Sequence, residues 1–123
     1  MKIFITGVAG FLGSHLADLM ISQGHTVAGN DNMIGGYTDS DIVYHTAATA
    51  YEGLSVFSPV LVTRNIFEAS VTTITAAIRN KVKRIVYCSS MARYGHHDEV
   101  PYKETYECRP QDPYGIAKKA SNQ

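Results

Sequence analysis

The chain of 123 residues contains only two cysteines, carries no net charge and has no long apolar run. A bilayer-spanning helix needs about 20 consecutive apolar residues, so the sequence does not predict a membrane protein. Cys88 and Cys108 form neither a metal-ligand spacing nor a disulfide framework, and we expect two reduced thiols and no bound metal. Because no second ligand stands at the required spacing, we expect His45 to pack within a strand and His96–His97 to lie exposed in a loop.

Two further absences narrow the class of protein. The balanced charge, with Lys81–Arg84 as the only basic cluster, argues against a nucleic-acid binder and favours a solvated turn at that cluster. The opening residues MKIFITG lack the long apolar core and the cleavage site of a signal peptide, which favours a cytoplasmic protein. With 45% hydrophobic and 18% charged residues, the chain has the composition of an ordinary soluble domain, and its length allows one.

Short β-branched and aromatic runs alternate with helical patterns along the chain. We expect strands in the segments KIFITG, HTVAGND, SDIVYHTAA and RIVYCSS, each mostly apolar and therefore covered on both faces. We expect helices at residues 11–24 and 59–81, a loop at 95–113, and the first turns of another helix after it. This alternation predicts an α/β fold, a doubly wound parallel sheet with helices on both faces.

A glycine-rich turn, TGVAGFLG, follows the first strand and opens the first helix. Gly7, Gly10 and Gly13 let the backbone turn tightly and approach a pyrophosphate, and the helix N-terminus offers N–H groups to the phosphates. Asp31, at the end of the second strand, is placed to bind both hydroxyls of an adenosine ribose and to repel a 2′-phosphate. The sequence therefore predicts a Rossmann-like domain that binds NAD. The alternative for Asp31 is a turn residue beside Asn32.

The segment YGIAK places Tyr114 and Lys118 four residues apart, on one face of the last predicted helix. A free phenol is a poor proton acceptor at neutral pH, but a neighbouring ammonium favours the phenolate. We therefore expect Lys118 to prepare Tyr114 for proton transfer.

Four motifs, TGVAGFLGSH, HTAA, YCSSMARYG and DPYGIAK, resemble in this order the extended short-chain dehydrogenase/reductase family, specifically its NAD-dependent epimerase/dehydratase group, which acts mostly on nucleotide sugars. The resemblance implies that Tyr114 is the acid/base for a substrate hydroxyl, that Lys118 holds the cofactor ribose, and that Ser90 hydrogen-bonds the reacting oxygen. Ser89 could exchange roles with Ser90, and a strand-end hydrogen bond is the alternative for Ser90. The residues expected to contact NAD are Gly7, Gly10, Phe11, Leu12, Gly13, Asp31, Asn32, Thr46, Ala47, Ala48, Tyr114 and Lys118.

The sequence departs from the family pattern at two places. Where the family's sugar 4,6-dehydratases carry acidic residues, this chain has Met91 and Ala92, so we expect no carboxylate there and disfavour dehydration. The asparagine of the family's NVxGT element falls on Ile66, with Asn65 one residue early, so we assign no role to Asn65.

The predicted second and third strands are separated only by residues 32–40. These strands flank the first strand of a doubly wound sheet, and such a crossover usually takes a dozen residues or more and a helix. Family members have a helix, a further strand and another helix here, and continue after the YxxxK helix into a substrate-binding lobe. We therefore expect residues 1–123 to form a partial NAD-binding domain, completed either by a longer chain or by other chains.

The leading hypothesis for function is an NAD-dependent oxidoreductase or epimerase that acts on a nucleotide sugar. A catalytically inert NAD(H)-binding module is the first alternative, and a sterol-type or small-alcohol dehydrogenase of the same family is a less favoured one. Because many relatives pair through two long helices, a homodimer is also considered.

Overall fold

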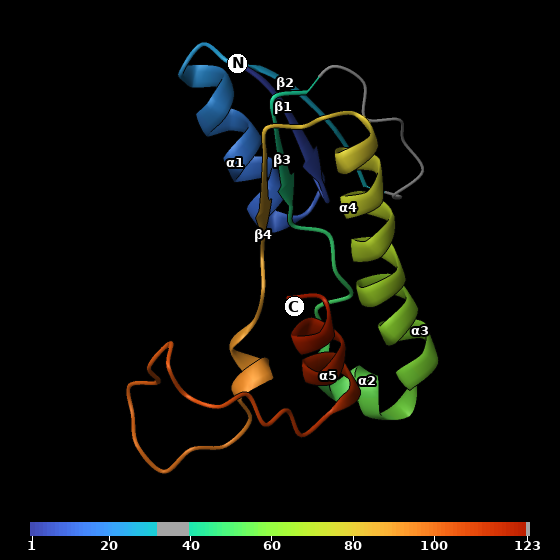
Figure 1. Cartoon of the computed structure of the whole chain (residues 1–123), viewed down its shortest axis with the longest axis vertical. Coiled ribbons are helices and arrows are strands. Elements are labelled where there is room, and N and C mark those ends of the chain that lie inside the picture. Colours follow the sequence, from blue (N-terminus) through green and yellow to red (C-terminus); the bar gives the residue numbers. More distant parts are fainter. Residues whose placement is uncertain (32–39, 123) are drawn as a thin grey trace. The chain divides into compact units, whose positions relative to one another are not determined.

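The computed structural model describes residues 1–31 and 40–122 (Figure 1). Its elements, in chain order, are β1 (Lys2–Thr6), α1 (Phe11–Ser22), β2 (Thr26–Asn30), β3 (Ile42–His45), α2 (Glu52–Phe57), α3 (Pro59–Thr63), the π-helical turn η1 (Arg64–Glu68), α4 (Ala69–Arg79), β4 (Arg84–Tyr87), the 3₁₀ turn η2 (Met91–Tyr94) and α5 (Pro113–Ala120). The chain divides into two compact units, Met1–Ala48 with Ala69–Cys88, and Thr49–Glu68 with Ser89–Gln123. Each unit is described by itself.

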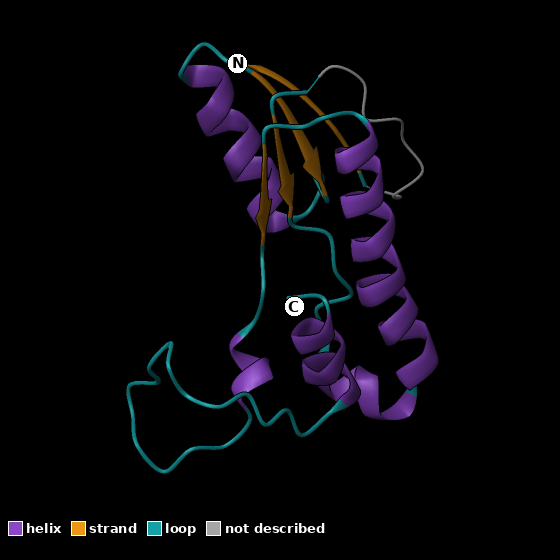
Figure 2. Cartoon of the chain, viewed as in Figure 1, coloured by secondary structure: helices purple, strands orange, loops and turns teal. Residues whose placement is uncertain are grey.

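The first unit is a parallel sheet of four strands in the order β2-β1-β3-β4. Ile5 of β1 lies opposite Gly29 of β2 on one side and Tyr44 of β3 on the other. Helices α1 and α4 lie on opposite faces of this sheet (Figure 2). The predicted doubly wound arrangement, with the second and third strands flanking the first, is therefore confirmed.

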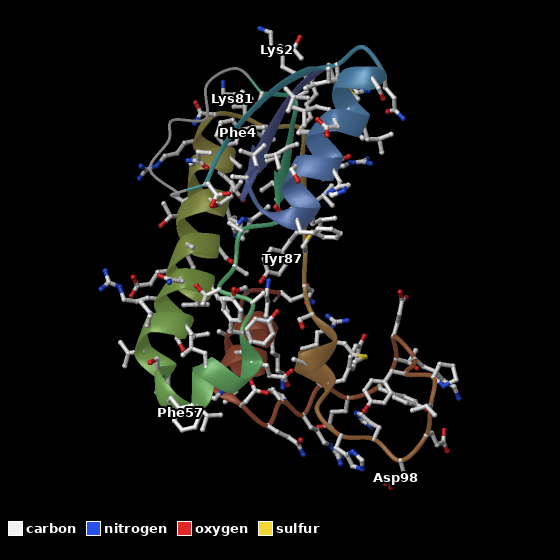
Figure 3. All side chains as sticks on the ribbon, turned by 180° about the vertical axis from the view of Figure 1, so that it is seen from behind. Lys2, Phe4, Phe57, Lys81, Tyr87 and Asp98 are labelled. Carbon is white, nitrogen blue, oxygen red and sulfur yellow. The ribbon has the colours of Figure 1, made fainter. Side chains whose placement is uncertain are left out.

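The core of the first unit is centred on β1 and β3. Phe4 and Val43 pack against Ala77 of α4, and Figure 3 labels Phe4 on its strand. Side chains alternate between the two faces of a strand, so Ile3 and Ile5 point away from this cluster, and both are buried. The apolar run of the first predicted strand is thus explained by cover on both faces.

The outer strand and the first helix are less covered than their sequences predict. In β2 the residues Thr26, Ala28 and Gly29 are exposed. In α1 Leu12 is 53% exposed, and Gly13 is the buried residue of the helix. The expectation of cover on both faces is therefore wrong for β2, because β2 is an edge strand whose partner among the described residues is β1.

The second unit is built from short helices, with α2 and α3 packing on each other and both on α5. Val62, Ile66 and Ala117 are among its buried apolar side chains. Phe57, at the turn between α2 and α3, extends away from these helices and is 86% exposed (Figure 3). Helical residues run from Pro59 to Arg79 through α3, η1 and α4, which confirms the predicted helix at 59–81.

Aromatic rings contact one another along the long loop before α5, two of the pairs edge to face. The ring of Tyr102 lies 6.1 Å from that of Tyr94 and 5.6 Å from that of His97, which in turn lies 4.9 Å from Tyr106. The prediction that His97 is exposed is therefore wrong, because its aromatic neighbours half bury it. His96 is exposed, as predicted.

Several polar features of the sequence lie away from the predicted site. Cys88 and Cys108 form no disulfide bond with each other. Lys81 lies exposed in the turn between α4 and β4, where its backbone N–H donates to the carbonyl of Ile78. Across residues 1–31 and 40–122, no helix is long and apolar enough to cross a membrane. Within the same residues, no three His, Cys, Asp or Glu side chains lie together as a metal site would need.

Candidate cofactor-binding and active site

The glycine turn after β1 is closely packed on two sides. Gly7 has a backbone φ angle of +73°, which residues other than glycine rarely adopt. A Cβ atom at Gly7 would lie 3.0 Å from the Cα of Ala47, and a Cβ at Gly13 would lie 2.8 Å from the carbonyl carbon of Gly7. The turn therefore brings the end of β3 and the first turn of α1 against the same peptide group.

The N-terminus of α1 is suited to an anion. Gly10 is its N-cap, no side chain caps it, and its first turn holds no acidic residue. The first backbone N–H groups of a helix have no partner within the helix, and they carry positive partial charge. Phe11 and Leu12 are exposed there. The glycine turn and the N-terminus of α1 together are suited to bind the pyrophosphate of a dinucleotide.

Asp31 is anchored at the glycine turn. Its Oδ2 accepts a hydrogen bond from the backbone N–H of Ala9 at 2.8 Å, a contact that the sequence pattern does not reveal. The carbonyl of Asn30 accepts from the N–H of Gly7 at 2.7 Å, which fixes the end of β2 beside the turn. Asp31 thus lies where a ribose ligand is expected, with its carboxylate held in place. The predicted neighbour Asn32 falls outside the described residues.

The end of β3 is tied to β1 through a buried histidine. The Nδ1 of His45 lies 2.7 Å from the hydroxyl of Thr6, and its Nε2 lies 3.1 Å from the hydroxyl of Ser70. Both ring nitrogens are therefore occupied, which confirms His45 as a packed strand residue. The segment Thr46–Ala48 follows, half buried, and its Ala47 lies beside the glycine turn.

Tyr114 and Lys118 are positioned by a well-formed helix start. Asp112 is the N-cap of α5, its Oδ1 accepts from the N–H of Gly115 at 2.8 Å, and Pro113 occupies the first turn. Tyr114 is 8% exposed and Lys118 is 3% exposed. The two predicted residues are therefore buried together, one turn apart on α5.

The two serines after β4 differ in their hydrogen bonding. Ser90 accepts a bond from the N–H of Ala92 at 3.2 Å and so caps η2. This bond leaves the proton of the Ser90 hydroxyl available for donation. The hydroxyl of Ser89 is buried and has no partner among the described residues. Since a Cβ on Gly115 would meet the carbonyl of Ala92, η2 packs directly on α5.

Carboxylates do lie near Met91 and Ala92, contrary to expectation. A pocket of about 180 Å³ in the second unit is lined by both residues together with Glu52 and Asp112. A hydrogen bond between these two carboxyl groups, with the charge of Asp112, raises the pKa of Glu52 above its usual value. Glu52 reaches this pocket from α2, far away in the sequence, so inspection of residues 91 and 92 could not find it.

Ile66, the residue predicted to fall on the family's asparagine, lies in the second unit. Ile66 is buried at 1% exposure within the π-helical turn. The side-chain amide of Asn65 donates to the hydroxyl of Thr49 at 3.0 Å. Asn65 therefore makes a contact within the second unit, and its role in chemistry stays unassigned.

Together, the parallel sheet, the glycine turn and the anchored acid at the end of β2 define a Rossmann-like nucleotide-binding fold. A sequence model described as "NAD dependent epimerase/dehydratase family" matches residues 3–123. The chain belongs to this family. Of the residues predicted to contact NAD, those of the glycine turn, Asp31 and Thr46–Ala48 lie in the first compact unit. Tyr114 and Lys118, together with the predicted catalytic Ser90, lie in the second.

Two relatives are sugar-nucleotide epimerases by name. A protein named probable UDP-arabinose 4-epimerase 3, from Arabidopsis thaliana, is 30% identical over a match that covers 95% of this chain and 37% of the relative. UDP-glucose 4-epimerase from Halalkalibacterium halodurans is 29% identical, with 98% and 44% covered. The chain thus spans less than half the length of these relatives. The second match extends over 146 residues, more than the 123 of this chain, so the relative has additional residues inside the matched region.

Solved structures show the same fold. UDP-glucose 4-epimerase from Brucella ovis, in complex with NAD, has a TM-score of 0.90 at 26% identity and covers 98% of this chain and 45% of its own. UDP-glucose 4-epimerase from Thermotoga maritima, with UDP-glucose, has a TM-score of 0.88 at 29% identity and covers 98% and 48%. These structures confirm the predicted fold class, and their chains are about twice as long.

Proposed function

We propose that this chain is the NAD-binding part of a nucleotide-sugar 4-epimerase in which Tyr114 is the acid/base. The observation that carries the proposal is the burial of Tyr114 and Lys118 one turn apart on α5. Residues four apart on a helix lie on the same face, so a phenol and an ammonium at these positions can act on one bound group. The names of the relatives, UDP-arabinose and UDP-glucose 4-epimerases, support the substrate class.

The first unit would hold the cofactor. The glycine turn and the N-terminus of α1 would bind the pyrophosphate, and Asp31 would bind the adenosine ribose. The NAD bound to the Brucella ovis enzyme supports this cofactor. NAD, when bound, supplies a reversible hydride acceptor.

The second unit would supply the proton chemistry. Tyr114 takes the proton of the sugar hydroxyl at the reacting carbon as that carbon is oxidised to a ketone, and returns it when the carbon is reduced on its other face. Lys118, one turn further along α5, would hold the cofactor ribose. Ser90, whose hydroxyl proton is not used by its bond to Ala92, donates to the reacting oxygen.

The proposal is tested by incubating the purified protein with NAD and either UDP-glucose or UDP-arabinose. Interconversion of the 4-epimers, followed by NMR of the sugar, is the expected result. Binding of NAD without turnover of either sugar would contradict the epimerase and favour the NAD(H)-binding module. Turnover of an apolar alcohol in place of the sugars would favour the small-alcohol dehydrogenase.

Asp31 offers a direct test of the cofactor assignment. We expect Asp31→Ala to weaken NAD binding about tenfold or more, because hydrogen bonds to a charged group are worth about 1.5–3 kcal/mol. The same variant should lose its preference for NAD over NADP, since the charge that repels the 2′-phosphate is gone. Calorimetry with both cofactors measures the effect. Asp98→Ala, a matched change at a fully exposed loop residue (Figure 3), should bind NAD like the wild type.

Ser90 and Ser89 can be separated by paired substitutions. We expect Ser90→Ala to lower kcat about 100-fold to 1,000-fold, the usual effect of losing one preorganised donor. Ser89→Ala removes a buried hydroxyl without a partner in the described structure and should leave kcat near that of the wild type. Steady-state kinetics on both variants gives the comparison. The reverse order of effects would assign the catalytic role to Ser89.

A further inference from the structure

Thr46, directly after β3, is one of the residues predicted to contact NAD. Its side-chain hydroxyl donates a hydrogen bond to the backbone carbonyl of Thr6, at the end of β1. A threonine hydroxyl has a single proton, so a hydroxyl that makes this bond has no proton left to donate to a ligand. The contact therefore directs Thr46 toward the backbone of β1 rather than toward a cofactor.

The bond from Thr46 holds one side of the peptide group that joins Thr6 to Gly7. On the other side of the same peptide group, the N–H of Gly7 donates to the carbonyl of Asn30, at the end of β2, at 2.7 Å. The atoms of a peptide group lie in one plane. Thr46 and Asn30 together therefore fix the orientation of this plane from two neighbouring strands.

Two further contacts reach Thr6, and both involve its side chain. The N–H of Ala47 lies 3.4 Å from the hydroxyl oxygen of Thr6, which is longer than is usual for an N–H···O bond. The Nδ1 of His45 lies 2.7 Å from the same hydroxyl. Because the bond from Thr46 is to the backbone instead, loss of the Thr46 hydroxyl acts on the peptide group and leaves these side-chain contacts in place.

The peptide group that Thr46 holds is the first of the glycine turn. The carbonyl of Gly7 accepts from the N–H of Gly10 at 3.0 Å, and Gly10 is the N-cap of α1. Phosphate groups bind to the free N–H groups at such a helix start. The direction of these N–H groups thus depends on the orientation of Gly7, and through Gly7 on Thr46.

We propose that Thr46 is a positioning residue for the bound pyrophosphate: its hydroxyl fixes the peptide group at the start of the glycine turn, and it acts on the cofactor only through that turn. This role rests on the proposed binding of NAD. Without the hydroxyl, the first peptide group of the turn keeps its bond to Asn30 and can rotate about it. The N–H groups at the start of α1 are then less well aligned with the phosphates.

Two substitutions at Thr46 separate the hydroxyl from the shape of the side chain, and calorimetry measures their binding of NAD and of ADP. ADP carries the adenosine and the pyrophosphate of NAD without its nicotinamide. We expect Thr46→Val to weaken both ligands equally, by about threefold to tenfold, the factor that one neutral hydrogen bond contributes. Thr46→Ser, which keeps the hydroxyl, should bind both like the wild type. Thr26→Val, a matched change at an exposed residue at the start of β2, should also do so.

Three binding results would overturn the proposal. Weaker binding of NAD but not of ADP by Thr46→Val would mean that the hydroxyl contacts the nicotinamide half of the cofactor directly. Equal weakening by Thr46→Ser and Thr46→Val would mean that the hydroxyl is not the cause. Unchanged binding of both ligands by Thr46→Val, with or without a loss of stability in urea, would leave Thr46 with a structural role alone.

The hydrogen bond itself is tested by NMR of the ligand-free protein. The ¹³C shift of the Thr6 carbonyl should change in Thr46→Val and stay near its wild-type value in Thr46→Ser, because this shift responds to loss of the bond. An unchanged shift in Thr46→Val would overturn the proposal at its first step. If the wild type binds neither NAD nor ADP, the proposed function fails, and the carbonyl shift still decides whether Thr46 holds the glycine turn.

Discussion

Replacement of Tyr114 with phenylalanine is expected to lower kcat for 4-epimerisation by about 10²–10⁴-fold, the usual contribution of a positioned general acid/base. The change removes one hydroxyl from a buried side chain and leaves its ring in place. NAD affinity should change little, because the predicted pyrophosphate contacts and Asp31, the predicted ligand of the adenosine ribose, lie in the first unit. Turnover of a UDP-sugar and calorimetric binding of NAD, measured on the same preparation, separate the two effects.

Tyr106→Phe is the matched control for this loss of a phenol. Its hydroxyl donates to Glu99 at 2.8 Å in the loop before α5, and this bond raises the pKa of Tyr106. We expect this variant to retain wild-type kcat. Equal kcat in Tyr114→Phe and the wild type would exclude Tyr114 as the acid/base. If Tyr114→Phe alone loses thermal stability, its kcat must be measured well below its melting temperature.

The parts of the site that the sequence predicts are those set by local geometry. Gly7 lies in the turn after the first strand and Gly13 in the first turn of the following helix, so their spacing alone indicates close approach of backbone. Tyr114 and Lys118 share a helix face because four residues complete about one turn. Asp31 follows a strand that pairs with the first, so its place beside the turn follows from the strand order.

Contacts between distant segments could not be predicted in this way. Ser55 and Asp112 are 57 residues apart in the sequence, and nothing in either segment indicates that they meet. The ring contacts that half bury His97 depend on two tyrosines of the same loop, Tyr102 and Tyr106. Such pairings are decided by how the chain packs, which single-segment patterns do not contain.

The short connection between β2 and β3 is only partly predictable from the sequence. The expected crossing from one side of β1 to the other is confirmed, and residues 31–41 are all that link the two strands. The additional residues of the Halalkalibacterium halodurans relative fit the expectation that family members are longer in such a region. A cytoplasmic location, a homodimer and a single partial domain stay predictions.

Substitution of Gly13 with alanine is expected to destabilise the protein and to weaken NAD binding together. The new Cβ would lie 2.8 Å from the carbonyl carbon of Gly7 and 2.9 Å from the Cα of Val8, both backbone atoms that cannot rotate away. Overpacking of this kind costs about 1–3 kcal/mol, which exceeds the gain of up to about 1 kcal/mol from the helix propensity of alanine. Urea unfolding measures the loss of stability.

The matched control is Gly53→Ala in α2, where an added Cβ meets nothing within 4 Å. This variant should be as stable as the wild type or up to about 1 kcal/mol more stable, because only helix propensity changes. If both alanine variants behave alike, α1 does not approach the glycine turn as closely as described. Gly13→Ala could instead keep the stability of the wild type and bind NAD about tenfold or more weakly. The close approach would then serve phosphate binding rather than the fold. Loss of one hydrogen bond to a charged phosphate is enough to weaken binding tenfold.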